Sequence, residues 1–171
     1  MKKLYAPWRY DYVRKQDKSG LFEGPLKNDC VFCHKFEAND DEKFLVVKRF
    51  ARCAVVMNYY PYTSGHLMIL PLAHKPSLQA LDQETRAEIM ELTNHGVIIT
   101  EKIMHCSGHN VGINLGIAGG GGIPSHLHVH VVPRWPGDTN FLTTTGEVTL
   151  ISSDFGKVYT LLREAFSTIT L

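Results

Sequence analysis

The element that most restricts the fold is a seven-residue run in which histidine alternates with apolar residues. Residues 126–132 read His-Leu-His-Val-His-Val-Val. Because successive side chains of a β-strand point to opposite faces, this run predicts a strand from His126 to Pro133. Its three imidazoles would share one face, and the intervening leucine and valines would fill the other face and pack into a core.

The rest of the sequence predicts an α+β domain with a mainly antiparallel sheet. Four more apolar runs, separated by charged or turn-forming residues, are typical of strands and bring the expected total to five; they are 44–50, 53–58, 66–72 and 110–116. Apolar residues at steps of three and four predict one long helix after the N-cap Asp82, and a last helix is expected over about 154–166. The first regular element is expected after Cys33, with residues 1–29 as an irregular arm.

Composition excludes several classes of function. The chain has 171 residues, 18 Lys and Arg and 17 Asp and Glu, so it is one domain with a net charge of +1. A broad basic surface for nucleic acid is therefore not expected. No apolar run approaches the length of a membrane span, and the start of the chain lacks the apolar core of a signal peptide. The cysteine spacing is not that of a secreted disulfide scaffold, which predicts a cytoplasmic protein.

The histidine run supports two interpretations. Neutral imidazoles are common metal ligands, as in a histidine-ligated metallohydrolase. However, residues four apart in a strand lie about 13 Å from one another, so one ion cannot contact both His126 and His130 without a bend. Imidazole is also a nucleophile at neutral pH, and neighbouring groups can fix which ring nitrogen is protonated. We favour one histidine as the nucleophile and its neighbours as orienting groups.

A glycine run indicates the substrate class. Residues 119–122 are four consecutive glycines, and they precede His126 by four positions. Consecutive glycines let backbone N–H groups approach an anion closely, although a flexible loop is the simpler explanation of such a run. Arg134 would add a fixed positive charge. Anion donors beside a nucleophile suggest attack on phosphorus.

Cys30 and Cys33 form a C-x-x-C pair. On its own this spacing fits a redox pair, half of a metal site or two buried thiols equally well.

Taken together, these motifs resemble the histidine triad family. Residues 126–132 match its H-φ-H-φ-H-φ-φ signature, where φ is an apolar residue. Pro133-Arg134-Trp135 and residues 137–141 are similar to its bacterial branch of diadenosine tetraphosphate phosphorylases and hydrolases. The resemblance covers about 29–141, which divides the single domain into an arm (1–29), a core (30–141) and a C-terminal segment with a helix (142–171). It implies a five-stranded α+β fold and a symmetric homodimer.

The resemblance also implies an activity, nucleotidyl transfer from a dinucleoside polyphosphate. His128 would attack the α-phosphate to form a nucleotidyl-histidine intermediate, His130 would orient that phosphate, and phosphate or water would accept the nucleotidyl group. The implied nucleotide contacts are Asn58 with the ribose and Asn114 with phosphate beside the glycine loop. Phe32 would line the adenine pocket or the core, and Trp135 would stack on a base or pack under the C-terminal segment. The full set is Asn58, Asn114, Gly121, Gly122, Phe32 and Trp135. The alternative function is a sensor that binds AMP or ADP with little turnover.

Some members of the family hold structural zinc, and the resemblance implies a closed site made of Cys30, Cys33, His74 and His126. We expect no organic cofactor and no nucleic-acid or membrane partner. The remaining histidines are given no catalytic role, and His66 is expected to make a structural hydrogen bond.

Overall fold

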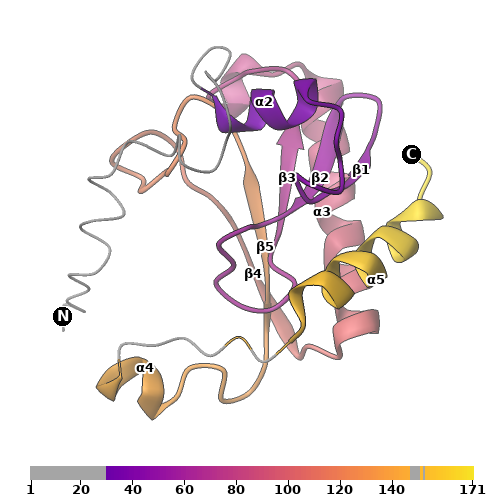
Figure 1. Ribbon diagram of the computed structural model, residues 1–171. Helices are drawn as coiled ribbons and strands as arrows, with labels where there is room; N and C mark the ends of the chain where they lie inside the picture. The colour runs from indigo at the N-terminus through magenta and orange to yellow at the C-terminus, as the bar shows by residue number, and fades with distance from the viewer. Residues whose placement is uncertain (1–29, 147–150, 152) are drawn as a thin grey trace.

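The computed structural model describes residues 30–146, 151 and 153–171, so the predicted N-terminal arm lies outside the described residues. Five strands form one antiparallel sheet in the order β1-β2-β3-β5-β4 (Figure 1). Their bounds are Val46–Arg49 for β1, Cys53–Met57 for β2, Leu67–Pro71 for β3, Gly108–Ile113 for β4 and Val129–Arg134 for β5. The predicted α+β fold with a five-stranded antiparallel sheet is confirmed.

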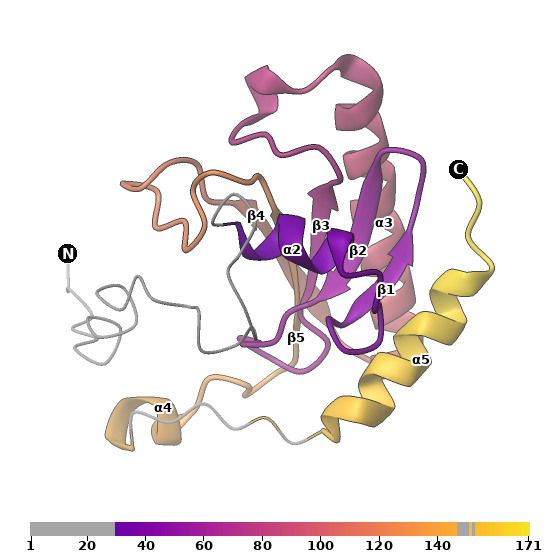
Figure 2. The same ribbon diagram turned by 45° about the horizontal axis from the view of Figure 1, so that its top comes forward.

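Helices cover both faces of this sheet. The long helix α3 lies along one face and the short helix α2 crosses the other, while α5 packs against β1 and α3 (Figures 1 and 2). The helices are α2 (Val31–Glu37), the short 3-10 helix η3 (Leu78–Ala80), α3 (Gln83–Met104), α4 (Phe141–Thr145) and α5 (Phe155–Ser167).

The predicted long helix and C-terminal helix both form where expected. Asp82 caps α3 by accepting from the backbone N–H of Thr85, and Asp154 caps α5 by accepting from that of Lys157. None of the helices in the described ranges combines the length and apolar character that crossing a membrane requires.

The two central strands, β2 and β3, are buried along their whole length because both faces of the sheet are covered. Alternate residues enter different cores. Val55 and Ile69 pack with Leu92 of α3, while Val56 packs with Phe32 of α2. The alternation of side chains along these strands thus forms two cores, one on each face of the sheet. α2 packs on the face that also carries the histidines.

Only the second half of the histidine run is a strand. β5 begins at Val129, so the prediction of a strand from His126 is wrong in its start. The partner strand β3 ends at Pro71, which has no N–H to donate, and the N–H of Leu127 donates to a loop carbonyl instead. The alternation nevertheless holds, since Leu127 and Val129 both pack in the core on the α3 side.

β4 starts and ends earlier than the predicted 110–116. Its last pair joins Ile113 to Val129, the first residue of β5, and the ladder cannot extend beyond the start of its partner. Asn114 therefore follows the strand and lies at the start of the glycine loop.

Two short α-helices, α2 and α4, and the 3-10 helix η3 were not predicted. α2 begins at Val31, inside the C-x-x-C pair, so the expectation that regular structure starts after Cys33 is wrong. Its apolar side, Val31 and Phe32, is buried against the sheet, and this tertiary packing stabilises a helix too short to form alone. α4 begins after Asn140, whose side chain accepts from the N–H of Leu142.

Candidate active site and metal centre

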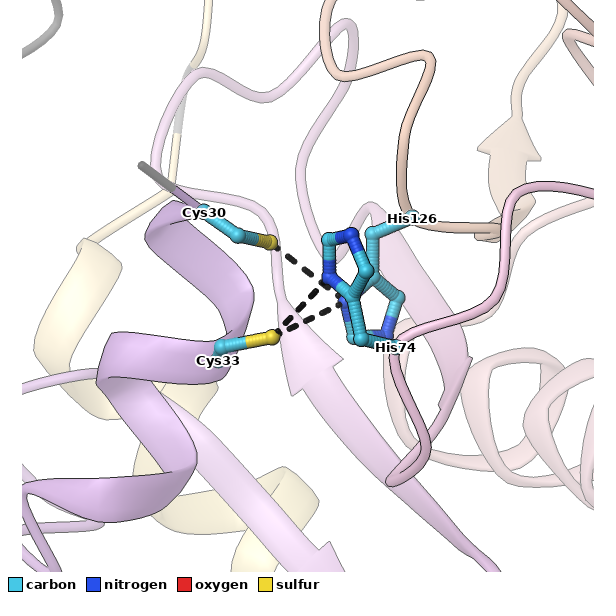
Figure 3. A group of neighbouring side chains, drawn as sticks. All are labelled: Cys30, Cys33, His74 and His126. Carbon is cyan, nitrogen blue, oxygen red and sulfur yellow. Dashed lines mark hydrogen bonds between the residues drawn. The ribbon is translucent and has the colours of Figure 1, made fainter. Parts of the chain in front are cut away.

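Two cysteines and two histidines from three segments meet beside the sheet (Figure 3). Cys30 and Cys33 lie at the start of α2, His74 follows β3, and His126 precedes β5. The Sγ of Cys33 is 3.1 Å from Nδ1 of His74, and the Sγ of Cys30 is 3.4 Å from Nδ1 of His126. All four candidate ligand atoms lie within 4.8 Å of one another. The structure therefore brings together the four residues that the resemblance implied as metal ligands.

Their chemistry suits a tetrahedral metal. Nε2 of His126 is 2.8 Å from the carbonyl oxygen of Pro71, which can only accept, so Nε2 carries the proton and Nδ1 points its lone pair at the sulfurs. Burial lowers the pKa of His126 to about 4, which keeps the ring neutral. Burial, followed by the hydrogen bond with Cys30, raises the pKa of Cys33 to about 12, so metal binding would have to displace a proton there.

His128 has a fixed tautomer. Its Nδ1–H donates to the backbone carbonyl of His126 over 2.9 Å, which leaves Nε2 as the unprotonated ring nitrogen. The side chain is buried, and its ring centroid lies 5.2 Å from that of Phe32 and 4.9 Å from that of His130. An imidazole held in this way presents the nitrogen lone pair that nucleophilic attack requires.

His130 is oriented by a histidine at the start of another strand. The backbone N–H of Tyr62 and the side-chain amide of Asn58 both donate to Nδ1 of His66, each over 3.2 Å. Nε2 of His66 therefore carries the proton and donates to Nδ1 of His130 over 2.9 Å. It follows that Nε2 of neutral His130 is itself a hydrogen-bond donor.

Burial keeps this histidine pair uncharged. Burial is the main reason why the pKa of His66 is lowered to about 3 and that of His130 to about 4. The neighbouring imidazoles lower both pKa values further. The site therefore offers neutral donors rather than imidazolium ions above about pH 4 to 5.

The part that His66 plays was missed from the sequence. A structural hydrogen bond was expected and is present, but its partner is the third histidine of the run. The available signal was a histidine directly after Gly65 at the start of a strand. What was missing is the strand order, because only the pairing of β3 with β5, with Met68 opposite His130, brings the two imidazoles together.

The glycine loop folds back on the residues before it. A side chain at Gly119 would meet the carbonyl oxygen of Leu115 at 2.4 Å, and one at Gly121 would lie 3.4 Å from the carbonyl oxygen of Asn114. Asn114 and His130 line the same groove. Close packing against the backbone thus explains why residues 119 and 121 are glycines. The phosphate contacts of Gly121 and Gly122 stay predictions.

The other predicted nucleotide contacts fall into two groups. Phe32 lies against His128, as a residue of the base pocket or of the core would, and Asn58 reaches the site through His66. Trp135 follows β5, and its indole N–H donates to the carbonyl of Met104 at the end of α3, over 3.3 Å. The structure therefore brings Phe32 and Asn58 to the triad and places Trp135 beyond the far end of β5.

Arg134, which was expected to add a fixed positive charge, is paired with a carboxylate. Its Nε and one terminal nitrogen donate to the two carboxylate oxygens of Asp138, over 2.6 and 2.7 Å, and the guanidinium also contacts Asn110. This bidentate pair cancels the charge locally and fixes the chain that leaves β5.

A five-stranded antiparallel sheet with three alternating histidines along and just before an inner strand, one of them with a fixed tautomer, defines a histidine triad protein. The family model of the HIT domain matches residues 39–137, and the chain belongs to this family.

Named relatives agree with this assignment. The chain is 37% identical over 153 residues to "AP-4-A phosphorylase" of Mycobacterium tuberculosis, a match that covers 85% of this chain and 74% of the relative. It is 29% identical over 85 residues to the asymmetrical "Bis(5'-nucleosyl)-tetraphosphatase" of Schizosaccharomyces pombe, covering 50% and 46%. A Zn-bound histidine triad family protein from Mycobacterium smegmatis has a similar structure, with a TM-score of 0.66, 25% identity and coverage of 81% and 93%.

The neutral histidine pair predicts a specific loss of stability in acid. The folded-state pKa of His66 lies below the usual 6.5, so its contribution is fully present above pH 6.5 and is lost as the pH falls from 6.5 toward about 3. Replacing His66→Gln keeps an amide donor but removes the titration. Between pH 6.5 and 4.5 the free energy of unfolding should therefore fall less steeply in the variant, by up to about 1.4 kcal/mol per pH unit.

Urea denaturation at several pH values measures this slope. His105→Asn, which replaces an exposed histidine at the end of α3, controls for the loss of an imidazole as such. Identical slopes in the wild-type protein and His66→Gln would contradict the assignment of His66 as a buried neutral group.

Proposed function

We propose that the protein transfers the adenylyl group of dinucleoside polyphosphates such as diadenosine tetraphosphate, through a covalent adduct on His128, with phosphate as the acceptor. The observation that carries the proposal is the fixed tautomer of His128, whose unprotonated Nε2 lies beside the oriented ring of His130. The 37% identical relative named as a phosphorylase supports the substrate and the acceptor.

The proposed reaction has two displacements at the same phosphorus. Nε2 of His128 attacks the α-phosphorus, the bond to the bridging oxygen breaks, and ATP leaves with that electron pair. The hydrogen bond from Nδ1–H to the carbonyl of His126 stabilises the positive charge that develops on the ring. Nε2–H of His130 donates to an oxygen of the phosphate, and inorganic phosphate then attacks the adduct and releases ADP. Water as the acceptor would give AMP instead.

Product analysis tests the proposal. With phosphate present, diadenosine tetraphosphate should yield equal amounts of ATP and ADP; a hydrolase would yield AMP with or without phosphate. His128→Gly should lower the rate by roughly 10³-fold or more, because no other group forms the adduct. Chromatography of the nucleotides provides the readout.

His105→Asn is the matched control for loss of a histidine, and circular dichroism checks that His128→Gly folds. Tight binding of AMP or ADP without any product would favour the sensor alternative. A His128→Gly variant with near-normal turnover would disprove the nucleophile assignment, whatever the products are.

We also propose that the Cys30, Cys33, His74 and His126 cluster holds zinc. Two thiolates and two neutral imidazoles form a closed tetrahedral site, which supplies stability rather than a reactive water. The Zn-bound relative supports this choice of metal. All four cysteines are free thiols, as the metal site requires and as a cytoplasmic protein would keep them.

Elemental analysis of the purified protein should give one zinc per chain. Cys30→Ser should lose the metal and lower the melting temperature by roughly 10 °C or more, since a structural zinc contributes several kcal/mol to folding. His34→Gln is a control on the same helix, because that ring packs on Phe44 outside the cluster. Metal-free protein of unchanged stability would rule the site out.

The homodimer that the resemblance implied is proposed to form along β4. Within the described part of the chain β4 is an outer strand, and its residue Val111 is 49% exposed. The outer edge of such a strand presents backbone N–H and C=O groups with which a strand of a second copy can pair, and the exposed valine adds apolar surface.

Light scattering should therefore show twice the chain mass, and Val111→Lys should shift the protein toward the monomer. Ile117→Lys, on the exposed glycine loop, is the control, because Ile117 lies outside β4 and is 84% exposed. A wild-type protein that is monomeric at all concentrations would contradict the proposal.

A further inference from the structure

A groove of about 380 Å³ runs along β4 and β5, at one edge of the sheet, and begins at His130. Its floor is formed by β4 and β5, with Asn110 and Gly112 on one strand and His130 and Arg134 on the other. Tyr62 stands at one end, with its ring stacked on that of His130, and Thr143 of α4 lies in its wall. The volume falls within the range of small-ligand pockets.

The groove extends away from Phe32, whose ring packs against those of His126 and His128. These two rings precede β5, whereas the groove follows β5 from His130 to Arg134, a length of about 13 Å at the rise of a strand. A substrate bound with one end near Phe32 and its reacting phosphorus near His128 and His130 would therefore continue into the groove.

The lining of the groove is nearly neutral. Arg134 is the one Lys or Arg among its described lining residues, and Asp138 pairs with it through two hydrogen bonds. The other polar groups are amides and hydroxyls, such as those of Asn110 and Thr143. Such groups suit a ribose and a base better than a chain of phosphates, whose charges would meet no uncompensated cation there.

We propose that this groove is the subsite for the leaving half of the substrate, and that its far end, between Asn110 and Thr143, receives the second nucleoside. The inference rests on the proposed function and adds what that function leaves open, namely how the protein recognises a nucleotide that has a nucleoside at both ends.

Gly112 allows a direct test. It lies opposite His130 in the β4–β5 ladder, its φ is not positive, and a Cβ added there would meet no atom within 4 Å apart from those of its chain neighbours. Gly112→Leu therefore fills the groove without clashing with the fold. Gly108 is a matched control, because it lies on the same strand and the same face, has the same open surroundings, and does not line the groove.

The readout is a ratio of two kcat/KM values in the same protein. One substrate is diadenosine tetraphosphate. The other is adenosine 5′-phosphofluoridate, which forms the same adduct on His128 when its P–F bond breaks but has fluoride as its whole leaving group. Gly112→Leu should lower the ratio of the first value to the second by about tenfold or more, since it occupies the volume of the bound group. Gly108→Leu should leave the ratio at the wild-type value.

Thr143→Val gives a second measurement at the far end. It removes one hydroxyl at nearly constant volume and should raise the KM for diadenosine tetraphosphate roughly three- to tenfold, while that for adenosine tetraphosphate, which lacks the second nucleoside, should not change.

Equal losses on both substrates in Gly112→Leu, or no loss on either, would overturn the groove assignment and leave the proposed function standing. A wild-type protein that turns over neither substrate would overturn the proposed function and this inference together.

Discussion

The site depends on one backbone hydrogen bond, from Nδ1–H of His128 to the carbonyl of His126. This hydrogen bond decides which ring nitrogen of His128 carries the lone pair. It forms only if the backbone of His126 has a fixed position. His126 is held by its own ring, since Nε2 donates to Pro71 and Nδ1 faces the two thiols of the metal cluster. The candidate structural metal and the proposed nucleophile therefore both depend on His126, which offers its side chain to the metal and its carbonyl to His128.

The position of this residue follows from the sheet. The last pair of the ladder between β3 and β5 joins Ile69 to Val129, so the segment that carries His126 and His128 lies outside the ladder. Its backbone groups then become available to side chains and loops. His126 of the candidate metal cluster and the hydrogen bond from His128 to its carbonyl lie in that short stretch, whereas His130, inside the ladder, is fixed by His66.

Patterns within one segment were predictable, and contacts between segments were not. Alternation along residues 126–132 and helical spacing after Asp82 reflect local geometry, so the strand face and the long helix followed directly from the sequence. The metal residues came from the resemblance, because no local rule joins Cys30 to His126. The hydrogen bond between His66 and His130 depends on strand order, and the pairing of Arg134 with Asp138 depends on a turn after β5. Neither contact could therefore be predicted from the sequence, and the second neutralises the charge expected at Arg134.

The near-neutral composition and the chemistry of the site have a common explanation. A nucleotide polyphosphate is a strong anion, yet His130 and its partner His66 are kept neutral by burial, and Arg134 is paired with Asp138. Neutral N–H donors bind phosphate more weakly than fixed cations, but they are directional and need no counterion when the site is empty. If the triad and the glycine loop hold the reacting phosphate in this way, the ends of the substrate must supply the remaining affinity. A base pocket at one end and a neutral groove at the other would then select substrates by length and shape, because charge alone would not distinguish them.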